Sequence, residues 1–362
     1  MAERRALEGL ELLMRVLVTG HDGYIGSVMV PLLEQAGHDV VGLDSYLYEG
    51  CTLGTEETPG GSLRLDIRAA EQRHFEGFDC VIHLAAISND PLGDYRPETT
   101  YDINHHAAVR VAKLAKAAGV PRFLFSSSCS LYGAAGDDFL DETADWNPVT
   151  PYGRSKLLAE HDLALLADDD FSPVYLRSST AYGVSRRLRG DLVVNNLAGL
   201  AFTTGRVLIM SDGTPWRPLV HIEDISRAFL AALEAPRELV HDEAFNVGRT
   251  EENYRVREVA DIVAAVIPGS EVAYAEDGGP DKRCYRVNCD KLAETLPAFD
   301  PQWTVRRGVE ELYEAFLREG LGEEEFASSR YLRIKRVKEL QEAGALDESL
   351  RWVARPALEL PA

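Results

Sequence analysis

Cysteine is scarce in this sequence, and the cysteines present are not grouped. Among 362 residues there are five, at 51, 80, 129, 284 and 289, with no C-x-x-C pair and no histidines at the spacing of zinc ligands. This pattern excludes a disulfide framework and the common zinc sites. We therefore expect no metal ion, and the reducing cytoplasm as the location.

Long uncharged apolar runs are also missing. No stretch of ~18 uncharged apolar residues occurs, and the apolar part of the opening MAERRALEGLELLM is too short for a signal peptide. The sequence therefore predicts no membrane-spanning helix. The opening residues are expected to form a short helical extension before Met14.

Positively charged residues are also few relative to acidic ones. Lysine and arginine number 38 against 59 acidic residues, which gives a formal net charge of -21. Such a chain repels nucleic acid and anionic membranes, so neither is expected as a partner. An anionic ligand must instead meet a local cluster of arginines and backbone N–H groups.

Apolar stretches alternate with helical patterns along the first half of the chain. Strands are predicted at RVLVT (15–19), VVGLD (40–44), CVIHLAA (80–86) and RFLFSSSCSLYG (122–133), with helices such as 27–37 and 104–119 between some of them. Strands that are apolar throughout indicate a parallel sheet covered on both faces. The expected fold class is α/β, a doubly wound parallel Rossmann sheet.

A glycine-rich turn joins the first strand to the first helix. It reads Thr19-Gly20-His21-Asp22-Gly23-Tyr24-Ile25-Gly26. Its glycines permit a tight turn, and they let a pyrophosphate approach the N–H groups at the helix N-terminus. Asp44 ends the next strand, where a carboxylate would bind an adenosine ribose and repel a 2′-phosphate. Together these features favour NAD over NADP.

A tyrosine and a lysine lie four residues apart, at Tyr152 and Lys156, with Ser128 upstream. Positions i and i+4 share a helical face, so the ammonium is expected near the phenol, where it would lower a tyrosine pKa that is ordinarily about 10. A tyrosinate could then take a proton from a substrate hydroxyl, with Ser128 hydrogen-bonded to the same oxygen. On an isolated helix, this spacing of a tyrosine and a lysine often occurs by chance. A chance occurrence is improbable here, because the glycine turn, Asp44 and the strand with the serines precede it in that order.

With these motifs the chain resembles the extended short-chain dehydrogenases, specifically the NAD-dependent sugar-nucleotide epimerase/dehydratase group, over roughly residues 15–320. The glycine turn matches that family's GxxGxxG pattern. The resemblance implies catalytic roles for Ser128, Tyr152 and Lys156, with Asn104 helping to hold the lysine. It implies NAD as cofactor, bound by Gly20, Gly23, Tyr24, Ile25, Gly26, Asp44, Asp66, Ile67, Leu84, Ala85, Ala86, Asn104, Tyr152 and Lys156.

The resemblance also implies a nucleotide-diphosphate sugar as substrate. Guanidinium groups bind phosphate oxygens well, and local arginines would offset the negative charge of the whole chain. The residues implied to contact the substrate are Ser128, Cys129, Ser130, Asn195, Asn196, Arg217 and Arg283. The likeness further implies a homodimer, formed through the helices that follow Asn104 and contain Tyr152.

The pattern along the chain, which changes to loops rich in Arg, Gly and Asn after about residue 178, predicts three parts. The NAD-binding Rossmann domain is expected to comprise residues 14–177 plus 220–250. A smaller substrate-binding lobe is expected from residues 178–219 plus 251–320. A helical tail is expected over residues 321–362, where the amphipathic segment RYLRIKRVKELQEAG is predicted to pack on the core or on a partner subunit.

The residues after Ser128 bear on the reaction. Dehydratases of the group carry Asp then Glu there, whereas this chain has Cys129 and Ser130, so dehydration is disfavoured. A 3,5-type epimerase would carry its cysteine at the second position, and Cys129 is better explained as a small buried residue. A simple 4-epimerase needs no additional acid or base, so the sequence favours a nucleotide-sugar epimerase acting at C4 through a transient keto sugar.

Three alternatives stay open at this point. The chain could be an NAD(P)H-dependent reductase of a nucleotide-linked keto-deoxy sugar, or a 3,5-type epimerase. It could also be a dinucleotide sensor without catalytic activity, although the intact Ser128, Tyr152 and Lys156 argue against that. No chemistry is assigned to the histidines, which include His21, His83, His105, His106 and His221.

Overall fold

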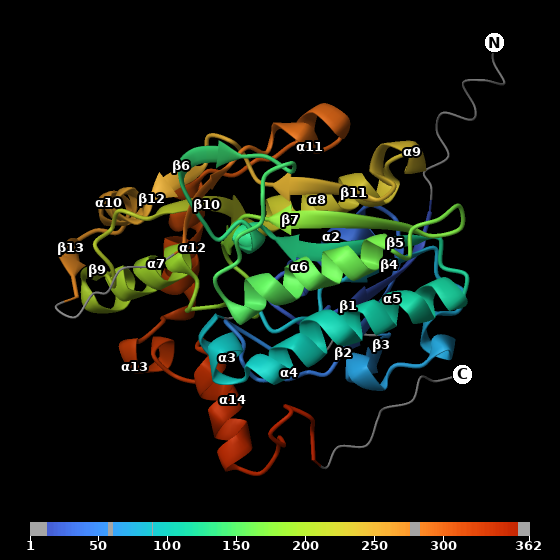
Figure 1. Ribbon diagram of the computed structural model, residues 1–362. Coiled ribbons are helices and arrows are strands. Elements are labelled where there is room, and N and C mark those ends of the chain that lie inside the picture. The colour runs from blue at the N-terminus through green and yellow to red at the C-terminus, as the bar shows by residue number, and fades with distance from the viewer. Residues whose placement is uncertain (1–12, 57–60, 89, 276–282, 354–362) are drawn as a thin grey trace.

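A computed structural model describes residues 13–56, 61–88, 90–275 and 283–353 of the chain, in which helices and strands alternate (Figure 1). The helical extension expected before Met14 lies almost entirely outside these residues. The strands are β1 (Arg15–Thr19), β2 (Asp39–Asp44), β3 (Ser62–Arg64), β4 (Cys80–His83), β5 (Arg122–Ser128), β6 (Ala134–Leu140), β7 (Ser172–Ser178), β8 (Thr180–Tyr182), β9 (Arg206–Ile209), β10 (Trp216–His221), β11 (Glu243–Val247), β12 (Asn253–Arg255), β13 (Glu271–Tyr274) and β14 (Cys284–Val287).

The helices follow the same order. The α-helices are α2 (Gly26–Gln35), α3 (Asp90–Tyr95), α4 (Pro97–Tyr101), α5 (Ala108–Ala117), α6 (Pro151–Ala164), α7 (Val193–Thr204), α8 (Ile222–Glu234), α9 (Arg237–Val240), α10 (Val256–Val266), α11 (Asp290–Thr295), α12 (Val305–Glu319), α13 (Glu323–Phe326) and α14 (Arg333–Glu342). Three short 3₁₀ segments, η1 (Ile67–Ala69), η2 (Gln72–Phe75) and η4 (Cys129–Leu131), and a π-helical segment, η3 (Asp102–Ala107), complete the set.

Seven parallel strands form the central sheet, in the order β11-β7-β5-β4-β1-β2-β3. The chain first moves outward from β1 to β2 and β3, then returns to the other side of β1 and continues through β4. Connections therefore leave the carboxyl ends of β1 and β4 in opposite directions and open a crevice between them. Ligands of doubly wound sheets bind at such a crevice. The predicted fold class is confirmed.

Both faces of the sheet are buried, which explains why its strands are apolar at consecutive positions. Val16 and Val18 of β1 face a core that α2 and α8 cover, whereas Leu17 faces a second core that α5 and α6 cover. Helices α5 and α6 lie side by side on the face of the sheet nearest the viewer in Figure 1.

A third core lies beside the sheet, where α7, α10 and α12 pack with the short strands β9 and β13. This part occupies the left of Figure 1. Leu292, Leu296 and Phe299, which the sequence placed with the smaller lobe, pack instead into the core under the central sheet. The division into a cofactor domain and a substrate lobe itself stays a prediction.

The C-terminal segment returns to the central sheet. Val337 of α14 and Leu350 pack with Ile87 and Leu92, next to the carboxyl ends of the strands. The amphipathic helix predicted in this region is present as α14, and it packs on the chain's own core. Within the described ranges, no helix combines the length and the apolar character needed to span a bilayer.

One predicted helix differs in detail. The sequence indicated a helix over 104–119, and the structure divides this region into the π-helical segment η3 and the regular helix α5. The π-helical segment carries Asn104. Its side-chain amide accepts a hydrogen bond from the backbone N–H of Ile87 and donates one to the backbone carbonyl of the same residue. Such segments frequently mark functional sites.

Candidate active site

The glycine turn after β1 forms one wall of a cavity of ≈ 160 Å³ at the switch point of the sheet. Gly20 has φ of 78°, and a Cβ at this position would lie 2.7 Å from the backbone nitrogen of Ala85. Only glycine allows β1 and the loop after β4 to approach this closely. The residues predicted for the cofactor that line this cavity are Gly20, Gly23, Tyr24, Ile25, Gly26, Asp44, Asp66, Ile67, Leu84, Ala85 and Ala86.

Helix α2 begins at this cavity. Its N-cap residue, Ile25, supplies no capping side chain, so the first N–H groups of the helix have no side-chain acceptor at the cap. The N–H groups of Ser27 and Val28 donate to the backbone carbonyls of Gly23 and Ile25, and the helix dipole favours an anion here. The glycine cradle and the open helix end fit the diphosphate of a dinucleotide.

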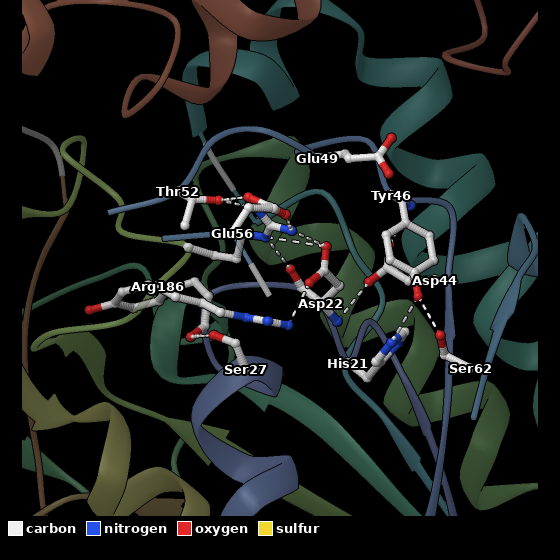
Figure 2. A network of polar contacts seen from close by, with 12 residues as sticks. His21, Asp22, Ser27, Asp44, Tyr46, Glu49, Thr52, Glu56, Ser62 and Arg186 are labelled. Atoms are coloured by element: carbon white, nitrogen blue, oxygen red, sulfur yellow. Dashed lines mark hydrogen bonds and ion pairs between the residues drawn. The ribbon is translucent and has the colours of Figure 1, made fainter. Parts of the chain in front are cut away.

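Asp44, the predicted ribose ligand, lines the same cavity. Its Oδ1 accepts a hydrogen bond from the backbone N–H of Tyr46 at 2.7 Å, and its Oδ2 accepts one from that of Asp22 at 3.2 Å. Figure 2 shows the carboxylate between these two groups. Burial raises the pKa of Asp44, while the neighbouring His21 and these N–H groups oppose the shift.

Two arginines fix the glycine turn from outside. Arg186 and Arg187 bind opposite oxygens of Asp22, at 2.7 and 2.6 Å, and Arg187 also binds Glu56 (the Arg186 contact is drawn in Figure 2). Sequence reasoning missed this network because its contacting pairs are 131 to 165 residues apart. The adjacent arginines in SRRLRG were the one visible signal.

Asn104 does not line either cavity. It is 1% exposed, and its amide accepts from the N–H of Ile87 at 2.7 Å and donates to the carbonyl of Ile87 and the hydroxyl of Ser155. All these partners belong to the protein, and its predicted role as a direct cofactor ligand stays a prediction. Asn104 ties the loop after β4 to α6.

A larger cavity of ≈ 760 Å³ adjoins the first, a volume within the range of small-ligand pockets. Six residues line both cavities, namely Tyr24, Ile25, Leu84, Ala86, Ser88 and Arg189. Of the predicted catalytic and substrate residues, those that line the larger cavity are Ser128, Ser130, Tyr152, Lys156, Asn196, Arg217 and Arg283. The structure thus brings the predicted catalytic residues to the wall of one cavity that opens to the cofactor side.

Helix α6 positions the tyrosine and the lysine. It begins at Pro151, and the hydroxyl of Thr150 caps it by accepting from the N–H of Gly153 at 3.2 Å. Tyr152 lies in the first turn and is hydrogen-bonded to Ser128 at the end of β5. One turn later, Lys156 places its ammonium 5.9 Å from the centre of the Tyr152 ring.

Burial controls the acidity of this pair. It raises the pKa of Tyr152 to about 12, with the hydrogen bond from Ser128 opposing the shift. It lowers the pKa of Lys156 to about 7, with Glu160 opposing. The sequence predicted a lowered tyrosine pKa, and the protein alone gives the opposite direction because desolvation of the phenolate outweighs the attraction of nearby cations.

Two predicted substrate residues point elsewhere. Cys129 is fully buried, lines neither cavity, and donates its thiol to the carbonyl of Arg177 at 3.0 Å. Asn195 is also fully buried, where it accepts from the N–H of Gly183 and donates to Tyr24. The neighbouring residues, Ser130 and Asn196, line the cavity in their place. Substrate contacts of Cys129 and Asn195 stay a prediction.

The two predicted diphosphate arginines lie together. Arg217 is 5% exposed and donates to the carbonyls of Trp216 and Arg283. Arg283 forms an ion pair with Asp90. This concentrates positive charge at one end of the larger cavity, in a chain whose net charge is strongly negative.

Several cavity residues were not foreseen. Arg189 lines both cavities and is held by Asp191 and Ser88. Arg333 and Leu350 line the first cavity from the C-terminal segment, which no sequence pattern linked to a ligand. Within the ranges that the structure covers, no cluster of three or more His, Cys, Asp or Glu side chains is placed to hold a metal ion.

Comparisons with known proteins point to one family. The model of the NAD dependent epimerase/dehydratase family matches residues 16–248. A UDP-glucose 4-epimerase of Lactobacillus helveticus is 28% identical over 290 residues, covering 74% of this chain and 87% of that protein.

Solved structures agree with this. The structure described as MoeE5 in complex with UDP-glucuronic acid and NAD is 27% identical, with a TM-score of 0.72, and covers 85% of this chain and all of that one. A UDP-glucuronic acid 4-epimerase of Bacillus cereus, in complex with UDP-glucuronic acid and NAD, is 25% identical with a TM-score of 0.72 over 84% of this chain and 99% of that one. The chain belongs to the NAD dependent epimerase/dehydratase family.

Proposed function

We propose that this protein is an NAD-dependent nucleotide-sugar epimerase that inverts C4 of the sugar through a transient keto sugar. The observation that carries the proposal is the convergence of Ser128, Tyr152 and Lys156 on a cavity that adjoins the glycine-turn cavity. The named relatives include UDP-glucose 4-epimerases and a UDP-glucuronic acid 4-epimerase, in agreement with this reaction.

Tyr152 moves the proton in this mechanism. Its Oη takes the proton of the C4 hydroxyl and later returns it to the keto oxygen, while the hydroxyl of Ser128 holds the same oxygen. The cationic form of Lys156 favours the phenolate against the cost of burial. NAD held by the glycine-turn cavity would supply reversible hydride transfer at C4.

The remaining cavity carboxylates support epimerisation over elimination. Dehydration requires an additional acid and base beside the keto sugar, and the stretch after Ser128 supplies none. Three carboxylates line the cavity, those of Asp90, Asp94 and Asp191. Asp90 and Asp191 are paired with Arg283 and Arg189 respectively, and Asp94 is exposed to solvent. A paired carboxylate is a poor base because its anionic form is stabilised.

The diphosphate of the substrate is assigned to the arginine end of the cavity. Arg217 and Arg283 supply guanidinium groups, and Asn196 supplies an amide on the same wall. Bidentate guanidinium contacts suit phosphate oxygens. With the diphosphate held there, the sugar reaches toward Tyr152.

The location and the assembly are also proposals. All five cysteines are free thiols, which agrees with the reducing cytoplasm. A homodimer through α5 and α6 agrees with the exposed Leu158 and Leu165, which are 39% and 74% exposed at α6 and its C-terminus. Light scattering that gives twice the chain mass supports the dimer, and a monomer mass refutes it.

The test is incubation with a panel of UDP-, dTDP-, GDP- and CDP-sugars plus NAD, followed by NMR and mass spectrometry. A product of unchanged mass, inverted at C4, supports the proposal. Turnover of a keto-deoxy sugar only when NADH or NADPH is supplied would establish the reductase instead, and inversion at C3 and C5 would establish the 3,5-type epimerase. NAD binding without turnover of any sugar would favour the remaining alternative, a dinucleotide sensor without catalytic activity.

A further inference from the structure

The glycine-turn cavity is bounded on one side by the C-terminal segment, residues 333–352, which lies outside the family match at 16–248. Arg333 and Leu350 from this segment line the cavity. Trp352 donates its indole N–H to the carbonyl of Ser45 at 2.7 Å, directly after the ribose residue Asp44. Residues 333–352 thus lie against the place predicted for the adenosine half of NAD.

Arg333 is an unusual residue in this wall. It is 4% exposed, its guanidinium lies 3.8 Å above the Tyr48 ring, and its Nη2 donates to the carbonyl of Arg187 at 3.0 Å. Its Nη1 is buried and has no hydrogen-bond partner among the described residues. Burial lowers the pKa of Arg333, although an arginine stays charged at any physiological pH.

No described carboxylate forms an ion pair with Arg333. Asp191 attracts it electrostatically, but both oxygens of that carboxylate are bound by Arg189, at 3.0 and 2.9 Å. A buried cation without a paired anion costs several kcal/mol, so such a group is expected to meet a negative ligand. The neighbouring wall, the open N-terminus of α2, also selects for an anion.

We propose that Arg333 binds the diphosphate of NAD and that residues 333–352 form a strap that retains the cofactor. The inference rests on NAD as the cofactor of the proposed function. The Arg333 guanidinium, on the part of the cavity wall that the C-terminal segment contributes, supplies a charge-assisted hydrogen bond to the diphosphate.

The strap is anchored at several points on the rest of the chain. Arg68 donates to the carbonyl of Ser349 at 2.7 Å, and Arg336 donates to that of Glu49 at 3.2 Å. Leu350 adds an apolar contact with Ile87 and Leu92. Release of NAD then requires these contacts to open, which slows dissociation.

The test compares Arg333→Gln with Lys335→Gln, which removes a charge from the exposed face of the same helix. Binding of NAD, ADP-ribose and adenosine to each purified protein is measured by calorimetry or by competition. Arg333→Gln is expected to weaken NAD and ADP-ribose about ten- to hundred-fold and to leave adenosine unchanged, because adenosine has no diphosphate. Lys335→Gln is expected to match the wild type for all three.

A second variant, Trp352→Ala, removes an anchor without touching the guanidinium. It is expected to raise the NAD dissociation rate several-fold in a chase experiment. Equal NAD affinity in Arg333→Gln and Lys335→Gln, or an equal loss for adenosine and NAD, would overturn the strap while the proposed function stands. Failure of the wild type to bind NAD would overturn both.

Discussion

The ammonium of Lys156 donates a hydrogen bond to the backbone carbonyl of Ser126, at 2.7 Å. Ser126 lies two residues before Ser128 on β5, so the lysine links α6 to the strand that carries the serine. This bond fixes Tyr152, one turn earlier on α6, relative to Ser128. Lys156, the lysine of the proposed mechanism, therefore links α6 to β5 in addition to carrying a charge.

Tyr152→Phe is expected to lower kcat by about 10²- to 10⁴-fold, because the variant has no hydroxyl to exchange a proton with the sugar. NAD affinity is expected to change little, since the ring remains. Both quantities are measured, with Tyr274→Phe as the control because Tyr274 is 51% exposed and lines neither cavity. Turnover by Tyr152→Phe at the wild-type rate would refute the mechanism.

Asp44→Asn is expected to reduce the ratio of the NADP dissociation constant to the NAD dissociation constant by roughly tenfold or more. The reason is that a neutral amide replaces the carboxylate that repels a 2′-phosphate. The measurement is the ratio of the two dissociation constants. Asp66→Asn provides a matched control, since Asp66 lines the same cavity without being assigned to the ribose. An unchanged ratio in Asp44→Asn would remove Asp44 from the selectivity argument.

Glu160→Gln is expected to reduce the free energy of unfolding by about 3–5 kcal/mol. Arg177 binds Glu160 through two nitrogens, with Nη2 to Oε2 at 2.8 Å, and both side chains are 5% exposed. The variant leaves a buried guanidinium without its anion. Asp39→Asn, which breaks the exposed pair with Arg15, is expected to cost less than about 1 kcal/mol in the same urea titration. Equal losses in the two variants would contradict this account.

His83→Gln is expected to make stability less sensitive to acid. Burial lowers the pKa of His83 from 6.5 to about 3. As the pH falls below 6.5, this histidine therefore binds a proton in the unfolded chain while it stays neutral in the folded chain. Stability is thus lost on acidification, by about 2 kcal/mol at pH 5 for this group. Glutamine preserves a partner for Thr19, which bonds His83 at 2.9 Å, without titrating. The wild type and the variant are compared by urea unfolding at pH 7.5 and pH 5, and equal losses would show that His83 does not contribute.

Local sequence patterns predicted the central part of the fold and site. The glycine turn, Asp44 and the Tyr152–Lys156 spacing each depend on neighbouring residues, so a single sequence reveals them. Gly20 is a clear example, because its closeness to Ala85 follows from adjacent parallel strands.

Other features depend on contacts that the sequence does not display. Arg333 reaches the cavity over about 300 residues of chain, and nothing near it indicates a ligand. The sequence did not reveal the direction in which the side chains of Cys129 and Asn195 point. That direction depends on whether a segment continues as a strand or turns into a helix. The direction of the Tyr152 pKa shift depends on burial, which only the packed structure supplies.

The central claim, direct return of hydride to C4, is tested most directly by running the reaction in deuterated water and measuring deuterium at the sugar carbons. The account predicts a C4-inverted product that contains no solvent deuterium on carbon, because the hydrogen stays on NAD between the two half-reactions. Deuterium at carbon would contradict it and would indicate enolisation instead.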